Sequence, residues 1–109
     1  MDEDLQRRIG HNEVVFRDVN EGISRGRWPG EGAVPIAFRC ECGEIGCSQM
    51  IELTAPEYER IRASSRRFFV ASAHEIPEAE TVVESHADYL IVEKRDVAAR
   101  VAEETDPRS

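Results

Sequence analysis

Residues 35–53 read PIAFRCECGEIGCSQMIEL and contain every cysteine of the 109-residue chain. Apolar residues flank the cysteines on both sides, which predicts one short strand over residues 35–39 and a second over residues 49–53. Two strands joined by a short connection form a hairpin. We therefore expect the cysteines to gather at the tip of a β-hairpin.

The three thiols, Cys40, Cys42 and Cys47, fall within eight residues. Alternate residues of an extended chain face the same side, which places Cys40 and Cys42 together. Gly43 and Gly46 allow the positive φ angles that a tight turn toward Cys47 requires. Clustered cysteines in a cytosolic protein more often bind metal or carry out redox chemistry than form structural disulfides. The spacing therefore predicts a corner for a soft metal ion, zinc above all.

A structural zinc ion takes four ligands, so an imidazole must complete the set. His74 follows a predicted strand in a loop that can turn back, and we predict that it is the fourth ligand. His86 is the substitute ligand, or else a hydrogen-bond partner of a ligand or a residue of a hairpin turn. Three thiolates and Zn²⁺ sum to about −1, a charge that the neighbouring Arg39 can offset. His11 lies on the polar side of a predicted helix, where we expect it to be solvated.

The same cysteines leave two other hypotheses open, a thiol redox sensor and a metal-dependent enzyme. A catalytic zinc usually keeps one position open for water. The signature of the zinc deaminases is missing from the sequence. No Ser/His/Asp constellation and no phosphate-binding glycine loop is visible either. We predict no catalytic residue.

Capping and strand signals predict the elements after the first hairpin. Thr54 can cap a helix that runs to about Ala63, and Glu57 completes a capping box. We expect a strand over residues 68–71. Residues 80–94 predict a second hairpin, although their first half is also compatible with a short acidic helix.

A last helix over residues 97–104, capped by Asp96, completes the predicted fold. The fold class is therefore α+β: a small zinc-stapled domain with two β-hairpins, a central helix, and N- and C-terminal helices. We assign residues 35–109 to this domain, residues 25–34 to a linker that holds Trp28, and residues 1–24 to an amphipathic helix.

Apolar residues recur along the N-terminal helix with spacings of three and four. Such a stripe normally packs on the core of its own domain. It can instead bind a protein partner or a second copy of the chain, with one polar member setting the register. The candidate partner-binding residues are Leu5, Ile9, Asn12, Phe16, Val19 and Ile23.

Composition narrows the function further. The hydrophobic fraction is 40%, the charged fraction is 33% and the formal net charge is −8. No apolar run approaches the roughly 20 residues of a membrane span, and no secretory signal opens the chain, so we expect a cytoplasmic protein. The acidic balance disfavours nucleic acid. The arginines between Arg60 and Arg67 keep nucleic-acid binding open as a weaker alternative. They can instead pair with Glu57 or Glu59 at a helix end.

Short segments spread along nearly the whole chain carry a family resemblance. They are Asn12-Glu13, Phe16-Arg17, Val19-Asn20-Glu21, Phe38-Arg39-Cys40-Glu41-Cys42-Gly43 with Cys47, Glu52-Leu53-Thr54, Glu57-Tyr58, Phe69-Val70, His74-Glu75, Val82-Val83-Glu84 and Tyr89-Leu90-Ile91-Val92-Glu93-Lys94. In these segments the chain resembles a family of small, mostly actinobacterial proteins without an assigned function. The resemblance implies a cytosolic, zinc-holding domain without a known catalytic residue, and a glycine is expected beside the histidine, where this chain carries Ser72 and Ala73. We predict a zinc-binding, non-enzymatic module for protein binding or regulation.

Overall fold

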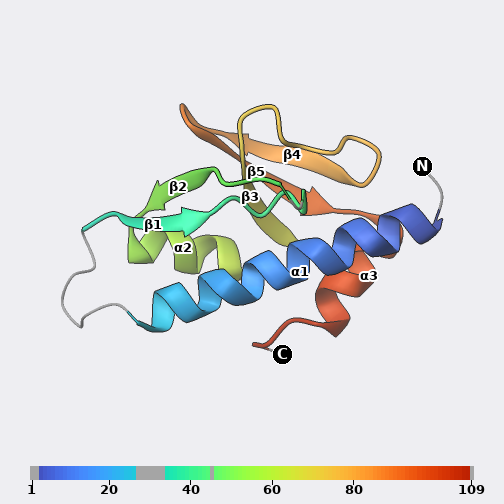
Figure 1. The fold of residues 1–109 in the computed structure, drawn as a ribbon, viewed down its shortest axis with the longest axis horizontal. Coiled ribbons are helices and arrows are strands. Elements are labelled where there is room, and N and C mark those ends of the chain that lie inside the picture. Colours follow the sequence, from blue (N-terminus) through green and yellow to red (C-terminus); the bar gives the residue numbers. More distant parts are fainter. Residues whose placement is uncertain (1–2, 27–33, 45, 109) are drawn as a thin grey trace.

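The computed structural model describes residues 3–26, 34–44 and 46–108, and within them the chain has an α+β fold, as predicted. The predicted central and terminal helices are all present (Figure 1). The helices are α1 (Glu3–Arg25), α2 (Ala55–Arg62) and α3 (Asp96–Glu104). The strands are β1 (Ile36–Arg39), β2 (Met50–Leu53), β3 (Arg67–Ala71), β4 (Glu80–Ser85) and β5 (Tyr89–Lys94).

Both predicted hairpins are confirmed. Strands β1 and β2 form an antiparallel ribbon in which Ile36 lies opposite Leu53. Strands β4 and β5 form the second hairpin, which settles residues 80–85 as strand rather than helix. Strand β3 pairs with the other side of β5, so the three-stranded sheet has the order β3-β5-β4. The β1-β2 ribbon lies beside this sheet, and α1 runs along the length of the molecule, below both in the view of Figure 1.

The main core is an aromatic cluster between the ribbon, α2 and the sheet. Phe38 and Tyr58 stack with ring centroids 4.5 Å apart, and Phe69 meets both rings edge-on at 6.1 Å. All three side chains are fully buried. The predicted capping box starts α2 beneath this cluster: Thr54 and Glu57 each accept a hydrogen bond from the other's backbone N–H. The capping box orients α2 so that its apolar side faces the aromatic rings.

Helix α1 packs against α3 and β1, but its buried face is largely polar. Glu13, Arg17, Asn20 and Glu21 are all buried. A small apolar cluster of Val14, Val97 and Val101 lies where α1 meets α3. The buried face is therefore rotated away from the apolar stripe on which the prediction rested.

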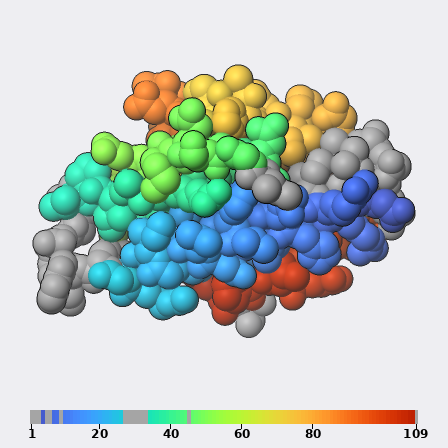
Figure 2. All heavy atoms as spheres, in the orientation of Figure 1, coloured from blue at the N-terminus to red at the C-terminus, as the bar shows by residue number. Residues whose placement is uncertain are grey.

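The predicted apolar stripe is divided between the interior and the solvent. Phe16 is buried, Ile23 packs partly against the main core and Asn12 is half-buried. Val19 is 45% exposed, and Val15, outside the predicted stripe, is 57% exposed. The alternative in which the whole stripe packs on the core of its own domain is therefore wrong at Val19, and the partner-binding alternative stays a prediction. Figure 2 shows α1 as a band of surface along the molecule.

Some predictions fall on residues outside the described ones. The side chains of Leu5 and Ile9 are among these, as is Trp28 within residues 27–33. The predicted linker begins slightly later than expected, because α1 ends at Arg25.

The start of α3 differs from the prediction. Asp96 is the first helical residue and does not cap the helix; the N-cap residue is Arg95, which makes no side-chain capping bond. Asp96 has a φ of 51°, in the left-handed region. Only Arg95 separates the end of β5 from the start of α3, so the connection is too short to hold a separate capping turn.

Candidate metal centre

Cys40, Cys42, Cys47 and His74 converge in the structure, and their ligand atoms all lie within 4.8 Å of one another. His74 Nδ1 lies 3.7 Å from Cys40 Sγ and 3.6 Å from Cys47 Sγ. The cysteines are buried and the histidine is half-buried. The four residues predicted as ligands from the sequence are therefore brought together, and this group could hold a metal ion.

The turn that carries the cysteines is tied to both sheets by its backbone. The Cys40 N–H donates to the Gln49 carbonyl, which extends the ribbon by one pair. The Glu41 N–H donates to the Phe69 carbonyl at 3.0 Å, so the chain now runs beside β3. Gly43 then reverses the direction with a φ of 77°, as its predicted role requires. The Cys47 N–H donates to the Glu44 carbonyl at 3.0 Å, so backbone hydrogen bonds hold both ends of the cysteine turn.

The histidine arrives from the turn at the end of β3. The His74 N–H donates to the Ala71 carbonyl at 3.0 Å, which closes a β-turn with Ser72 and Ala73 at its centre. Ala73 has a φ of 70° and Ser72 does not have a positive φ. These angles define a type II turn, whose third position favours glycine. Ala73 occupies the position where the family resemblance predicts a glycine beside the histidine.

Burial raises the pKa of two of the three thiols, Cys40 and Cys42. Burial raises the pKa of Cys40, and the two neighbouring thiols raise it further, against the Ala71 N–H that donates to its Sγ at 3.1 Å. Burial also raises the pKa of Cys42. Thiolates are the metal-binding form, so an ion must displace protons on entry.

Arg39 stands beside the turn, as predicted, but it does not contact a sulfur in the described hydrogen bonds. Its Nη2 donates to the Cys47 carbonyl at 3.0 Å, and its guanidinium lies 4.5 Å from the centroid of the Phe16 ring. The cation therefore holds the turn closed and adds positive potential next to the thiols.

Asn20 and Glu41, two polar residues that the sequence interpretation overlooked, support the cysteine turn. The Asn20 side chain pairs with both the N–H and the C=O of Arg39, at 2.8 Å each. Its Nδ2 also donates to Glu41 Oε2 at 2.9 Å, and Glu41 Oε1 accepts from the Phe69 N–H. Burial raises the pKa of Glu41 to about 7 against these hydrogen bonds. No local signal marks Asn20 or Glu41, because each bonds a segment far away in the chain.

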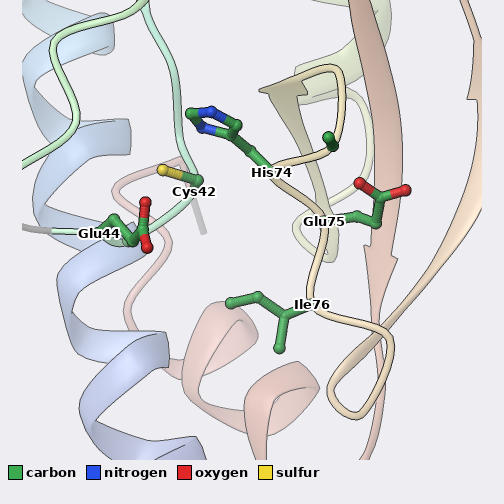
Figure 3. Close-up of a pocket in the computed structure, with 7 residues that line it drawn as sticks. Cys42, Glu44, His74, Glu75 and Ile76 are labelled. Atoms are coloured by element: carbon green, nitrogen blue, oxygen red, sulfur yellow. The ribbon is translucent and has the colours of Figure 1, made fainter.

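A pocket of about 280 Å³ opens beside the cluster. Cys42 and His74 form one wall, as Figure 3 shows. Glu44, Glu75 and Ile76 line the remainder. The pocket therefore gives small molecules a route to one sulfur and the imidazole.

The other two histidines lie apart from the cluster. His86 stacks on Tyr89 with centroids 4.4 Å apart, and its Nε2 lies 3.1 Å from Glu84 Oε1. It belongs to the tip of the second hairpin rather than to the group of four. His11 is exposed on α1, as predicted.

The arginines between Arg60 and Arg67 all have carboxylate partners, but not the ones predicted. Arg62 is buried and bonds Glu21 and Asp106. The other pairs are Arg60 with Glu84, Arg66 with Glu103 and Arg67 with Glu93. The expected Glu57 and Glu59 are used elsewhere, Glu57 in the capping box and Glu59 with Arg108.

Comparisons with protein-family models, curated proteins and solved structures gave no match. The resemblance to the actinobacterial family therefore stays a prediction from the sequence. Among the helices of the described residues, none combines the length and the apolar character that a membrane crossing needs.

Proposed function

We propose that this chain is a cytosolic zinc-binding protein in which Cys40, Cys42, Cys47 and His74 hold one structural Zn²⁺. The observation that carries the proposal is the convergence of three sulfurs and one imidazole nitrogen within 4.8 Å. Zinc prefers thiolate and imidazole ligands in tetrahedral sites. The ion would connect the cysteine turn to the loop after β3.

We also propose that the protein is a non-enzymatic module that binds a protein partner or regulates one. Four protein ligands fill a tetrahedral zinc site and leave no position for a reacting water. Helix α1 offers a contact for the partner, because Val15 and Val19 are exposed four residues apart on its outer side.

Zinc content tests the metal proposal. We expect one zinc per chain in the full-length protein purified without chelator, and a large loss in Cys47→Ser and in His74→Ala. His86→Ala is the matched control, because this histidine lies apart from the four ligands, and it should keep its zinc. Cobalt in place of zinc reports geometry through the visible spectrum of a tetrahedral thiolate site. Metal-free wild-type protein, or equal zinc in the His74 variant and the wild type, would refute the ligand assignment.

A thiol redox sensor is the second candidate, and the pocket beside Cys42 favours it. Through this pocket, hydrogen peroxide would reach a zinc-bound thiolate. Two thiolates, one hydrogen peroxide and two protons from solvent would give one disulfide and two waters, and a bound metal ion would lose two of its ligands. Zinc retained under mild peroxide, with all cysteines still reduced, argues for the structural role alone.

A further inference from the structure

Three charged side chains meet in the interior, away from the cysteines. Glu13 comes from α1, Glu80 from β4 and Lys94 from β5, and each side chain is at most 1% exposed. The Lys94 ammonium donates to Glu13 Oε2 and to Glu80 Oε1. It also lies 5.2 Å from the centroid of the Phe68 ring. These three residues, the buried triad, link the N-terminal helix to the second hairpin.

The buried triad has one negative charge too many when all three groups are ionised. The remaining oxygens, Glu13 Oε1 and Glu80 Oε2, are buried, and neither has a hydrogen-bond partner among the described residues. A buried carboxylate oxygen without a donor is costly, and so is a net charge away from water. One added proton removes the excess charge. Burial raises the pKa of Glu13 to about 8, with Lys94 opposing this shift and Glu80 adding to it.

Among the contacts described for Glu13 and Glu80, Lys94 is the cation that bonds both carboxylates. Glu41, from the cysteine turn, adds negative potential at Glu13. Arg17 shares the Phe68 ring with Lys94, but its terminal nitrogens donate to the carbonyls of Ser65 and Ala102. Helix α3 meets this part of α1 with uncharged side chains, Val97 and Val101.

We propose that Glu13 holds a proton beside Glu80 and Lys94 while α1 is docked, and that α1 opens from the sheet more readily as the pH rises from weakly acidic to weakly alkaline. Deprotonation leaves two carboxylates competing for one ammonium in the interior. Opening relieves this repulsion, because Glu13 leaves with α1 while Glu80 and Lys94 remain paired. The buried triad thus acts as a pH-sensitive latch on the helix.

The sign of the pH dependence follows from the two states of Glu13. Docked, Glu13 keeps its proton up to a pH of about 8; in water it loses the proton near its ordinary value of 4.5. Between these values the docked form binds the extra proton, so each rise of one pH unit favours opening about tenfold. Above about pH 8 both forms are deprotonated and the opening equilibrium becomes constant.

Hydrogen exchange on the metal-loaded full chain measures this opening. After correction for the intrinsic exchange rate, protection of the α1 amides should fall about tenfold per unit between about pH 5 and pH 8. Glu13→Gln mimics the protonated carboxyl and should flatten the slope. Glu80→Gln is the second variant and should do the same. Glu78 is exposed and lies two residues before Glu80. Glu78→Gln is therefore the control and should leave the slope unchanged.

Two further readouts make the outcome decisive. The infrared band of a protonated carboxyl should be present at neutral pH, disappear in alkali and weaken in Glu13→Gln. Amides of β5 should keep their protection while those of α1 lose it. The proposal is overturned if the band is the same in wild type and variant, if neither glutamine variant flattens the slope, or if α1 and β5 amides lose protection together.

Discussion

Replacing Ala73 by glycine should stabilise the protein, although glycine usually does the opposite. Ala73 is the third residue of the type II turn before His74, with a φ of 70°. Its side chain is exposed, so losing the methyl group removes no buried contact. The substitution therefore isolates the backbone strain in the turn that delivers the histidine.

The size of the effect is a difference between two terms. A non-glycine residue in the left-handed region costs about 1–2 kcal/mol, which glycine does not incur. Glycine loses more freedom on folding, and this costs about 0.5–1 kcal/mol relative to alanine. Ala73→Gly should therefore raise the free energy of unfolding by up to about 1.5 kcal/mol, with a central value of about 0.75 kcal/mol, which raises the melting temperature by a few degrees.

Urea denaturation of the zinc-loaded protein measures this change against a matched control. Ala63 is also exposed, but it caps α2 with an ordinary φ of −62°. Ala63→Gly should lower the unfolding free energy by about 0.5–1 kcal/mol, because no strain is relieved there. The two variants should shift in opposite directions. Equal destabilisation by both would show that Ala73 is not strained, and the reasoning would fail.

Three further predictions concern the polar interior. Arg62→Met should lower the unfolding free energy by about 3–5 kcal/mol in urea denaturation, because it removes the buried guanidinium that bonds both Glu21 and Asp106, although Glu21 keeps its pair with Arg108. Arg67→Met, which breaks a half-exposed pair with a 3.7 Å separation, should cost at most about 1 kcal/mol; equal costs would contradict the assignment. Burial raises the pKa of Glu21, but hydrogen bonds from Arg108 and Arg62 outweigh it and lower the value to about 2. Its stabilisation is therefore complete above pH 4.5 and is lost as the pH falls toward 2, so Glu21→Gln should make the acid limb of a stability–pH curve shallower. Asn20→Ala removes three hydrogen bonds at 2.8–2.9 Å and should cost about 3 kcal/mol in the same urea assay, whereas a loss under about 1 kcal/mol would mean that water replaces the amide.

Local patterns predicted the elements well, because their signals lie within a few residues. The capping box of Thr54 and Glu57 is read from four consecutive positions. Both hairpins follow from short apolar runs with turn residues between them. The cysteine spacing likewise predicted which sulfurs would meet, because one turn carries all three.

The orientation of α1 could not be predicted in this way. A hydrophobic stripe predicts the buried face only when the partner surface is apolar. Here the partners are Arg62, Lys94 and the aromatic rings, and they select Glu13, Glu21 and Arg17 for burial. Complementary charges on residues that are far apart in the sequence leave no periodic pattern in it.

The charged inner face of α1 has a consequence during synthesis. Helix α1 is synthesised before two of its cationic partners: Glu13 lies 81 residues before Lys94, and Glu21 lies 87 residues before Arg108. Until those cations exist, the carboxylates of α1 stay hydrated, because burying a carboxylate without a partner is costly. The docking of α1 through Glu21 is therefore complete only after Arg108 has been synthesised.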